Sequence, residues 1–350
     1  MSTEGMLDRD KKVWLNEISF MRPCLLVLLV LYHVFAPYVG TWEKPDGIGD
    51  VELYRWIGLL SKAFRLEGFV FISGYIFTFQ FIERHKYPKL SLLLKSKIKR
   101  LLITSFFFSI LYLLIFNYYD SPFDFVRKVI QGAGHLWYLP CLFWCFVIQY
   151  LVLRKDNPGI IVPVLIVILL ISIIPLPLNL HKPLYYALFF YGGGYFWKHS
   201  QKIKTFATWK TVTLCWILFG VLFIVLNSIT IRISGYYNQI TNLLLRGCVL
   251  EFKNISKAIL GWAGIVALYL SASLYCQKHR ISDFAIIVGA CGYGVYIFHQ
   301  FVLKYIYNCT DAPILWGSYY LPWVACIITI VVSLSLTLLI RKTKVGRTFL

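Results

Sequence analysis

Two ionisable side chains interrupt the first long apolar stretch of the sequence, Arg22 and His33. In a helix, their spacing of eleven positions returns to within about 20° of the same face and adds about 16 Å along the axis. An ionisable group inside a membrane span is costly and therefore marks a candidate functional site. An arginine fork binds phosphoryl oxygens, and an imidazole exchanges protons near neutral pH. Two structural interpretations stay open: Arg22 as a snorkelling anchor and His33 as a packing histidine.

A second group of polar residues opens the next apolar stretch, with Arg65 and Glu67 at its start and Ser73 about 9 Å deeper. If this segment runs back through the membrane, the acid and the hydroxyl approach the depth of His33. A shared cavity in the outer half is then expected. The alternatives are a local ion pair between Arg65 and Glu67, and a Ser73-Gly74 step that only permits close helix packing.

Seven Lys and Arg residues fall within residues 84–100, among them Lys97, Lys99 and Arg100. Lys and Arg both bind phosphoryl oxygens strongly, so this segment can hold the phosphates of a nucleotide-containing donor. The alternative is that these cations only keep the loop on the cytoplasmic side.

Two later segments combine histidine with aromatic residues. His135 and Trp137 open one apolar stretch, where an aromatic belt or a sugar contact would both suit them, and Tyr293 precedes His299 in another. No Gly-rich phosphate loop, zinc-type Cys/His spacing or serine-hydrolase elbow is present, so we predict no metal site.

The elements that must position these residues are transmembrane helices. The chain is 59% hydrophobic and only 15% charged over 350 residues, which excludes soluble and disordered classes. Apolar stretches long enough to cross a bilayer, some short or interrupted, predict an all-α polytopic membrane protein with about ten spans. They lie near residues 20–39, 68–83, 101–118, 136–153, 159–176, 184–197, 211–230, 258–276, 284–306 and 320–340. The sixth contains Gly192-Gly193-Gly194 and is expected to be a broken helix or no span at all.

The distribution of basic residues predicts the orientation. With the N-terminus inside, the inner segments hold 22 of the 35 Lys and Arg residues and the outer loops hold 10. We therefore expect a cytoplasmic N-tail at 1–19, a membrane domain at 20–340 and a cytoplasmic C-tail at 341–350. The net charge of +19 then serves topology and contact with anionic lipid, and no nucleic-acid partner is expected.

The sequence resembles the membrane acyltransferase 3 family of multi-spanning O-acyltransferases. Arg22, ten residues and His33 match its first motif, and Phe69-Val70-Phe71-Ile72-Ser73-Gly74-Tyr75 matches its second. A basic stretch then follows at Lys97-Ile98-Lys99-Arg100. The segments His135-Leu136-Trp137-Tyr138-Leu139 and Tyr293-Gly294-Val295-Tyr296-Ile297-Phe298-His299 are also similar. The family often has Pro-x-Phe-Phe before Ser-Gly, whereas Gly68-Phe69-Val70-Phe71 stands here.

The resemblance implies transfer of an acyl group, commonly acetyl from acetyl-CoA, to a hydroxyl of a surface or lipid-linked carbohydrate. Acyl-CoA is expected as a co-substrate with no permanently bound cofactor. We also expect no appended extracellular esterase-like domain, and a location in a bacterial inner membrane or plasma membrane.

Roles follow for the candidate residues. His33 is the expected general base, with Glu67 orienting its ring. Arg22 is assigned both to catalysis and, with Lys97, Lys99 and Arg100, to binding of the donor. Arg65, Ser73, His135, Trp137, Tyr293 and His299 are assigned to the acceptor or to support. A covalent acyl group on His33 or Ser73 is a variant. The rival hypothesis is a transporter or flippase for a lipid-linked sugar, in which the same residues line a path.

Overall fold

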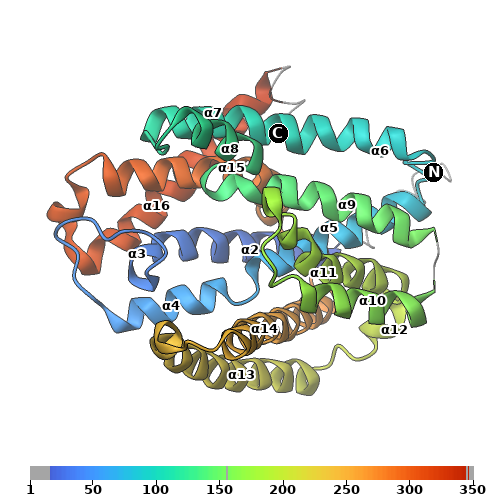
Figure 1. Cartoon of the computed structure of the whole chain (residues 1–350). Coiled ribbons are helices and arrows are strands. Elements are labelled where there is room, and N and C mark those ends of the chain that lie inside the picture. The colour runs from blue at the N-terminus through green and yellow to red at the C-terminus, as the bar shows by residue number, and fades with distance from the viewer. Residues whose placement is uncertain (1–15, 155–156, 344–345, 347–350) are drawn as a thin grey trace. The chain divides into compact units, whose positions relative to one another are not determined.

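Every regular element in the part of the chain that the structure describes is a helix (Figure 1). The computed structural model describes residues 16–154, 157–343 and 346. The helices are α2 (Asn16–Val34), α3 (Ala36–Val39), α4 (Glu52–Lys62), α5 (Arg65–Ile82), α6 (Leu90–Lys97), α7 (Ile103–Phe116), α8 (Pro122–Gln131), α9 (Tyr138–Leu153), α10 (Pro158–Ile171), α11 (His181–Lys198), α12 (Ser200–Lys204), α13 (Trp209–Tyr236), α14 (Leu243–Lys278), α15 (Asp283–Asn308) and α16 (Ala312–Lys342). A π-helical turn η1 (Ile98–Leu102) and the 3₁₀ turns η2 (Gly134–Trp137), η3 (Pro177–Asn179) and η4 (Tyr237–Gln239) complete the set.

Seven helices of the described chain are long and apolar enough to cross a membrane. They are Asn16–Val34, Leu90–Phe116, Gly134–Leu153, Trp209–Gln239, Leu243–Lys278, Asp283–Asn308 and Ala312–Lys342. The predicted class, an all-α polytopic membrane protein, is confirmed. The predicted segments 68–83, 159–176 and 184–197 are helical too, as α5, α10 and α11, but they are not among the seven. The count of ten spans stays a prediction.

The chain divides into two compact units. The first unit contains the described parts of Met1–Phe69, Ser200–Asn227 and Ile259–Leu339. The second contains those of Val70–His199, Ser228–Ala258 and Ile340–Leu350. The helices α5, α13, α14 and α16 each begin in one unit and end in the other.

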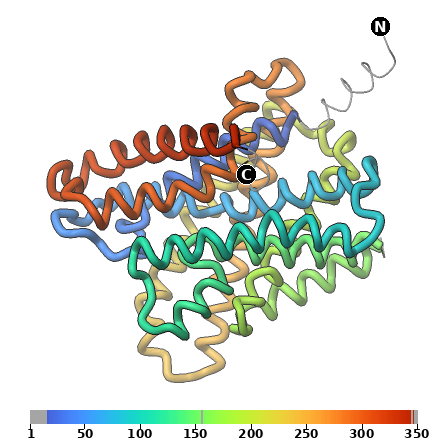
Figure 2. The backbone as a smooth tube through the Cα atoms, turned by 90° about the horizontal axis from the view of Figure 1, so that it is seen from above, coloured from blue at the N-terminus to red at the C-terminus, as the bar shows by residue number. Residues whose placement is uncertain are grey.

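The first unit is organised around α2, which packs against α15 in a parallel direction. A Cβ on Gly289 would lie 3.3 Å from the Cβ of Arg22, and ten residues later the ring of His299 lies beside that of His33. The stripe of α2 that carries both ionisable residues therefore faces α15. α16 turns back along α15 (Figure 2). A Cβ on Gly294 would lie 2.4 Å from side-chain atoms of Thr337, so the two helices are in close contact there.

The parallel direction of α2 and α15 bears on the number of crossings. If only the seven candidate helices crossed a membrane, four crossings would separate α2 from α15, and the two would be antiparallel. A parallel pair requires an odd number of further crossings in between. The helices α5, α10 and α11 supply three, as the predicted ten spans require.

Successive helices of the second unit alternate in direction. The ring contacts of Phe77 with Phe146 and of Phe81 with Tyr150 make α5 and α9 parallel. Lys97 lies over Phe146, and Ser105 donates to the carbonyl of Leu136, so the continuous helix from α6 to α7 runs opposite to α9. α11 runs parallel to α9, because Trp137 faces Tyr186 and Gln149 faces Gly194. α10 connects α9 to α11 in the chain and runs in the opposite direction to both. Five successive crossings would produce this alternation.

Two glycines allow α5 and α11 to touch through their backbones. A Cβ on Gly74 would lie 1.8 Å from the carbonyl oxygen of Phe190, and one on Gly193 would lie 2.0 Å from that of Phe71. Contact at this distance is impossible for any residue with a Cβ. The expectation of a broken helix at Gly192-Gly193-Gly194 is therefore wrong: α11 is continuous, and the glycines serve packing.

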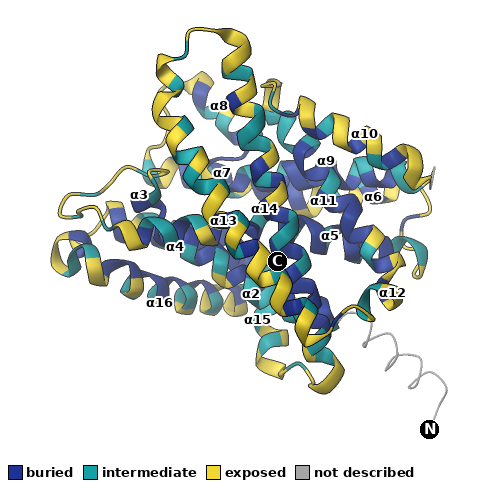
Figure 3. Ribbon diagram, turned by 90° about the horizontal axis from the view of Figure 1, so that it is seen from below, coloured by how far each residue is buried: buried dark blue, intermediate teal, exposed yellow. Residues whose placement is uncertain are grey.

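The outward apolar side chains suit a lipid environment. Figure 3 shows exposed residues along α13. Among them, Leu214, Ile217 and Ile224 are 65%, 59% and 59% exposed. Large apolar side chains exposed along a whole helix are unfavourable in water and favourable against hydrocarbon chains.

Three segments that lie between the predicted spans contain helices. The basic segment 84–100 enters α6 at Leu90 and continues through η1, so its cations lie on a helix. Within 40–67 the amphipathic helix α4 forms, and 230–257 is covered by the end of α13, by η4 and by the first half of α14. Polar residues within these helices lower the local hydropathy, which is why the predicted spans do not include them. Most of the predicted N-tail and C-tail lies outside the described residues.

Candidate functional site

The first unit brings together two of the predicted histidines. His33 lies in the last turn of α2 and His299 in the second half of α15, with ring centroids 4.9 Å apart. The first is 8% exposed and the second is fully buried. Because α2 and α15 pack in parallel with Arg22 and Gly289 in register, the two imidazoles meet about three helical turns from Arg22.

Backbone contacts determine which ring nitrogen of His299 carries the proton. Its Nδ1 lies 2.7 Å from the carbonyl oxygen of Tyr296 and 3.1 Å from that of Val295. Carbonyl oxygens only accept, so Nδ1 carries the hydrogen and the neutral ring has its lone pair on Nε2. Gln300, the next residue on α15, places its amide nitrogen 3.5 Å from Nδ1 of His33. The His33 ring is thus contacted by a second imidazole and an amide.

A wall of aromatic residues covers the histidine pair. Trp42 stacks on His33 with ring centroids 5.8 Å apart, and the Lys304 ammonium lies 4.5 Å from the centroid of the Trp42 ring. The Tyr307 hydroxyl donates to the carbonyl of Val34 at 2.7 Å, which ties α15 to the end of α2. These contacts hold the 40–51 segment over His33.

Arg65 and Glu67 open α5 inside the first unit, and both are buried. The Arg65 guanidinium carbon lies 3.6 Å from the ring centroid of Tyr32, the neighbour of His33. A Cβ on Gly68 would collide with Leu25, so this turn of α5 packs directly on α2. The fully buried Glu67 belongs to this turn, which the Arg65 and Gly68 contacts place against α2 between Leu25 and Tyr32.

Arg22 and Tyr293 complete the predicted residues of the first unit. Arg22 is half-buried one turn into the apolar part of α2, and Tyr293 is half-buried on α15 between Gly289 and His299. α2 is therefore one continuous helix that carries Arg22 and His33 on one stripe, as the sequence spacing predicts. Both side chains face the same neighbour, α15.

The other predicted residues lie in the second unit. Ser73 is half-buried on α5. Lys97 rests its ammonium 3.6 Å from the Phe146 ring centroid, whereas Lys99 and Arg100 are exposed on the π-helical turn η1. Single π-helical turns are rare in proteins, and those that occur are often located at functional sites. His135 is buried in η2 and touches Tyr112, with Trp137 half-buried beside it.

Sequence reasoning missed Gln300, Trp42 and Lys304. Gln300 directly follows a predicted histidine on a helix, and an amide in an apolar stretch is a signal that could have been used. Trp42 gave none, because it meets His33 only through folding of the 40–51 segment. Lys304 is brought to the site by its contact with the Trp42 ring. Among the described residues, no group of His, Cys, Asp and Glu side chains could hold a metal ion.

Comparison with protein-family models gives a match over nearly the whole chain. The sequence model of the Acyl_transf_3 family, described as an acyltransferase domain, matches residues 15–342. No curated protein and no solved structure matches the chain. The match spans α2 to α16, including the histidine pair and the basic turn. The chain therefore belongs to the Acyl_transf_3 family, and it is an integral multi-pass membrane acyltransferase.

Proposed function

We propose that the protein transfers an acyl group, acetyl in the first place, from cytoplasmic acyl-CoA to a hydroxyl of a cell-surface or lipid-linked carbohydrate. The observation that supports this proposal most directly is the buried pair of His33 and His299 in a member of an acyltransferase family. Two imidazoles that are buried together supply proton transfer, which is the main chemical requirement of hydroxyl acylation.

The proposed reaction is a direct transfer. The acceptor oxygen attacks the thioester carbonyl carbon while His33 takes the hydroxyl proton. The C–S bond then breaks, and the CoA thiolate leaves and recovers a proton from the imidazolium. His299, with its lone pair on Nε2, lies close enough to share the positive charge that His33 gains. The Glu67 carboxyl stabilises the same charge from α5.

The donor is assigned to residues that the charge distribution predicts on the cytoplasmic side. Arg22 suits the thioester carbonyl or a phosphate, because its planar fork donates two parallel hydrogen bonds. Lys97, Lys99 and Arg100 suit the CoA phosphates. The exposed positions of Lys99 and Arg100 on η1 agree with contact to a soluble donor.

The proposal is tested with purified protein in lipid vesicles that contain a saccharide acceptor on one side and labelled acetyl-CoA on the other. We expect one free CoA for each ester formed, and formation only when acetyl-CoA is on the side of the basic turn. A transporter or flippase would move the saccharide without releasing CoA. Saccharide movement with intact acetyl-CoA would contradict the proposal.

A further inference from the structure

The segment 40–51 turns the indole of Trp42 toward the histidine pair. Thr41 and Glu43 on either side of it are exposed, whereas Trp42 is half-buried. Its ring stacks on that of His33, with centroids 5.8 Å apart and an angle of 29° between the ring planes. The indole therefore covers one face of the His33 ring.

The backbone on both sides of Trp42 is attached to helices of the first unit. The amides of Thr41 and Trp42 donate to the carbonyl of Ala36 in α3, at 3.1 and 3.4 Å. Farther along the segment, the Gly49 amide donates to the Ser318 hydroxyl of α16 at 2.7 Å. The position of Trp42 is thus set by a segment that is bonded to the helices at two places.

Side chains of α15 hold the indole in place. The Lys304 ammonium lies 4.5 Å from the centroid of the Trp42 ring, and the Tyr307 ring meets the indole at 80° with centroids 6.2 Å apart. Indole is the aromatic ring that attracts a cation most strongly. Gln300, one turn before Lys304 on the same helix, contacts the His33 ring. One stripe of α15 therefore contacts both the indole and the ring that the indole covers.

The cover matters because His33 lies at the end of its helix. It is the last residue but one of α2, and it is nevertheless only 8% exposed. A base that takes a proton from a sugar hydroxyl would also take one from water, which has the same O–H group and is far more abundant. Exclusion of water from a reaction site prevents side reactions of this kind.

The side reaction would consume the acyl donor. The oxygen of water attacks the thioester carbonyl carbon, and His33 takes one proton from this water. The C–S bond breaks, the proton passes from His33 to the sulfur, and a carboxylic acid and CoA are the products. An acyltransferase that acts through a base must suppress this hydrolysis if the acyl group is to reach the acceptor.

We propose that Trp42 gives the transfer its specificity for the acceptor hydroxyl over water, because its indole keeps water away from His33. The inference rests on the proposed function for the role of His33 as the base. Trp42 acts through His33 and is therefore a positioning residue. Lys304 supports it by holding the indole over the imidazole.

The accessibility of His33 is measured first, without substrates, on the full chain in lipid nanodiscs. Diethyl pyrocarbonate modifies neutral imidazoles, and mass spectrometry gives the rate at His33 relative to the exposed His199. We expect Trp42→Ala to raise this rate at least about tenfold, and Trp42→Phe, which keeps an aromatic face, to raise it less than about threefold. Trp209→Ala is the matched control and should leave the rate unchanged, because Trp209 is 75% exposed at the start of α13.

The fate of the acyl group is measured next, with labelled acetyl-CoA. Without an acceptor, Trp42→Ala should release CoA at least about tenfold faster than the unmodified protein. With a saccharide acceptor, less than about half of its released CoA should be matched by ester. The double variant Trp42→Ala/His33→Ala should lose the added hydrolysis, because no base then activates the water.

Lys304 provides a second test that leaves the indole unchanged and does not depend on folding of Trp42→Ala. Lys304→Met should raise hydrolysis about threefold, because the cation–π contact is lost. Lys304→Arg, which keeps this contact, should restore the hydrolysis rate of the unmodified protein. A purely structural defect would instead lower ester formation and hydrolysis together.

The outcomes distinguish this inference from the proposed function. If the unmodified protein forms ester and Trp42→Ala still releases one CoA for each ester, the proposed function stands and the inference is wrong. Unchanged modification of His33 in Trp42→Ala would overturn the inference as well. Faster modification of His33 in a protein that acylates no acceptor would support the cover and contradict the proposed function.

Discussion

At the scale of single residues, the two histidines of the pair are suited to different roles. His299 has its proton held by two backbone carbonyls, so its orientation and tautomer are fixed, while His33 contacts a ring and an amide. A fixed neighbour of this kind suits a supporting role. His33 then performs the proton transfer, and His299 determines how readily that proton is accepted.

We predict that His299→Gln lowers kcat about a hundredfold and changes the KM for acyl-CoA less than about twofold. Loss of the second imidazole removes support for the charge on His33 without touching donor binding. Steady-state kinetics in lipid measures both constants. His199→Gln is the control, because His199 is exposed and its ring lies 4.3 Å from that of Tyr195, away from the histidine pair in the sequence. An unchanged kcat in His299→Gln would make His299 a packing residue.

The sequence predicted part of this site. Arg22 and His33 share a stripe because helical periodicity is a local property, and the structure has them facing one neighbour. The partners of His33 come from α15 and from the 40–51 segment. Their approach depends on packing between distant parts of the chain, and no single spacing in the sequence encodes it.

At the scale of elements, the contact between α5 and α11 depends on glycine. We predict that Gly193→Ala destabilises the folded protein by about 1–3 kcal/mol, because its Cβ would lie 2.0 Å from the Phe71 carbonyl oxygen and force the helices apart. Gly220→Ala is the matched control: it also lies inside a helix, and a Cβ there meets nothing within 4 Å. Thermal unfolding in detergent measures both. Equal unfolding temperatures for the two variants would refute the close contact.

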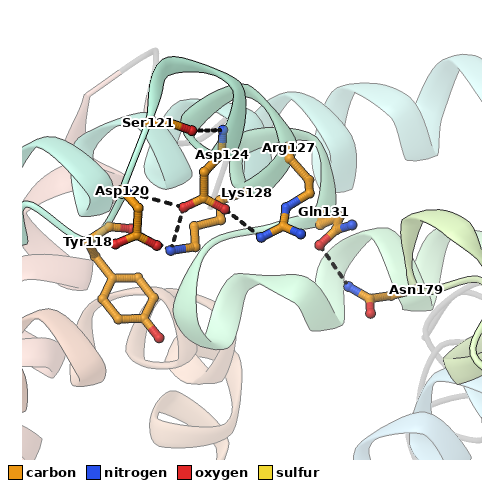
Figure 4. A network of polar contacts seen from close by, with 8 residues as sticks. All are labelled: Tyr118, Asp120, Ser121, Asp124, Arg127, Lys128, Gln131 and Asn179. Atoms are coloured by element: carbon orange, nitrogen blue, oxygen red, sulfur yellow. Dashed lines mark hydrogen bonds and ion pairs between the residues drawn. The ribbon is translucent and has the colours of Figure 1, made fainter.

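The short helix α8 is stabilised by one carboxylate (Figure 4). Asp124 accepts from Lys128 at 2.8 Å and from Arg127 at 2.5 Å, and its own amide donates to the Ser121 hydroxyl at 3.1 Å. The hydrogen bond from Lys128, with further help from Arg127, lowers the pKa of Asp124 to about 2. The charged form is thus favoured by folding.

The lowered pKa predicts a pH dependence with a definite sign. The stabilisation is present above the unfolded pKa of about 3.9 and is lost as the pH falls toward about 2. We expect Asp124→Asn to lower the unfolding temperature at pH 7 and to make no difference near pH 2. Asp46→Asn, at an exposed loop position, is the control and should have no effect at either pH. A constant difference between Asp124→Asn and the unmodified protein across this range would contradict the account.

Prediction at this scale succeeded where apolar character was continuous. The long apolar stretches are all helical, whereas the charges of the basic segment 84–100 hide a helix in its second half. Lys97 remains compatible with an apolar helix because its ammonium rests on the Phe146 ring. A contact of this type between two helices cannot be read from hydropathy.

At the scale of the whole molecule, the direction of the helices is the most informative finding about topology. The parallel packing of α2 and α15 and the alternation from α5 to α11 both agree with ten crossings. In the first unit, contacts of Glu17 with Lys204 and of Phe20 with Tyr275 gather the start of α2 with the segments around residues 204 and 275 at one end. The charge distribution predicts those segments to be cytoplasmic.

We predict that a cysteine at Asp46 is labelled by a membrane-impermeant thiol reagent from outside the cell, and a cysteine at Lys89 only from inside. Both positions are exposed, so the reagent can reach each of them from the side of the membrane on which it lies. The background variant replaces the exposed Cys248 and Cys309 by serine. Labelling of both cysteines from the same side of the membrane would contradict the predicted topology.

In the proposed mechanism, His33 transfers the acceptor proton. The most direct measurement is the initial rate of ester formation by His33→Ala in lipid vesicles, compared with the unmodified protein and with His199→Ala at matched amounts of folded protein. We predict a rate at least about a thousandfold lower for His33→Ala, an unfolding temperature within a few degrees of the unmodified protein, and a normal rate for His199→Ala. A folded His33→Ala protein that forms ester at the unmodified rate would contradict the account.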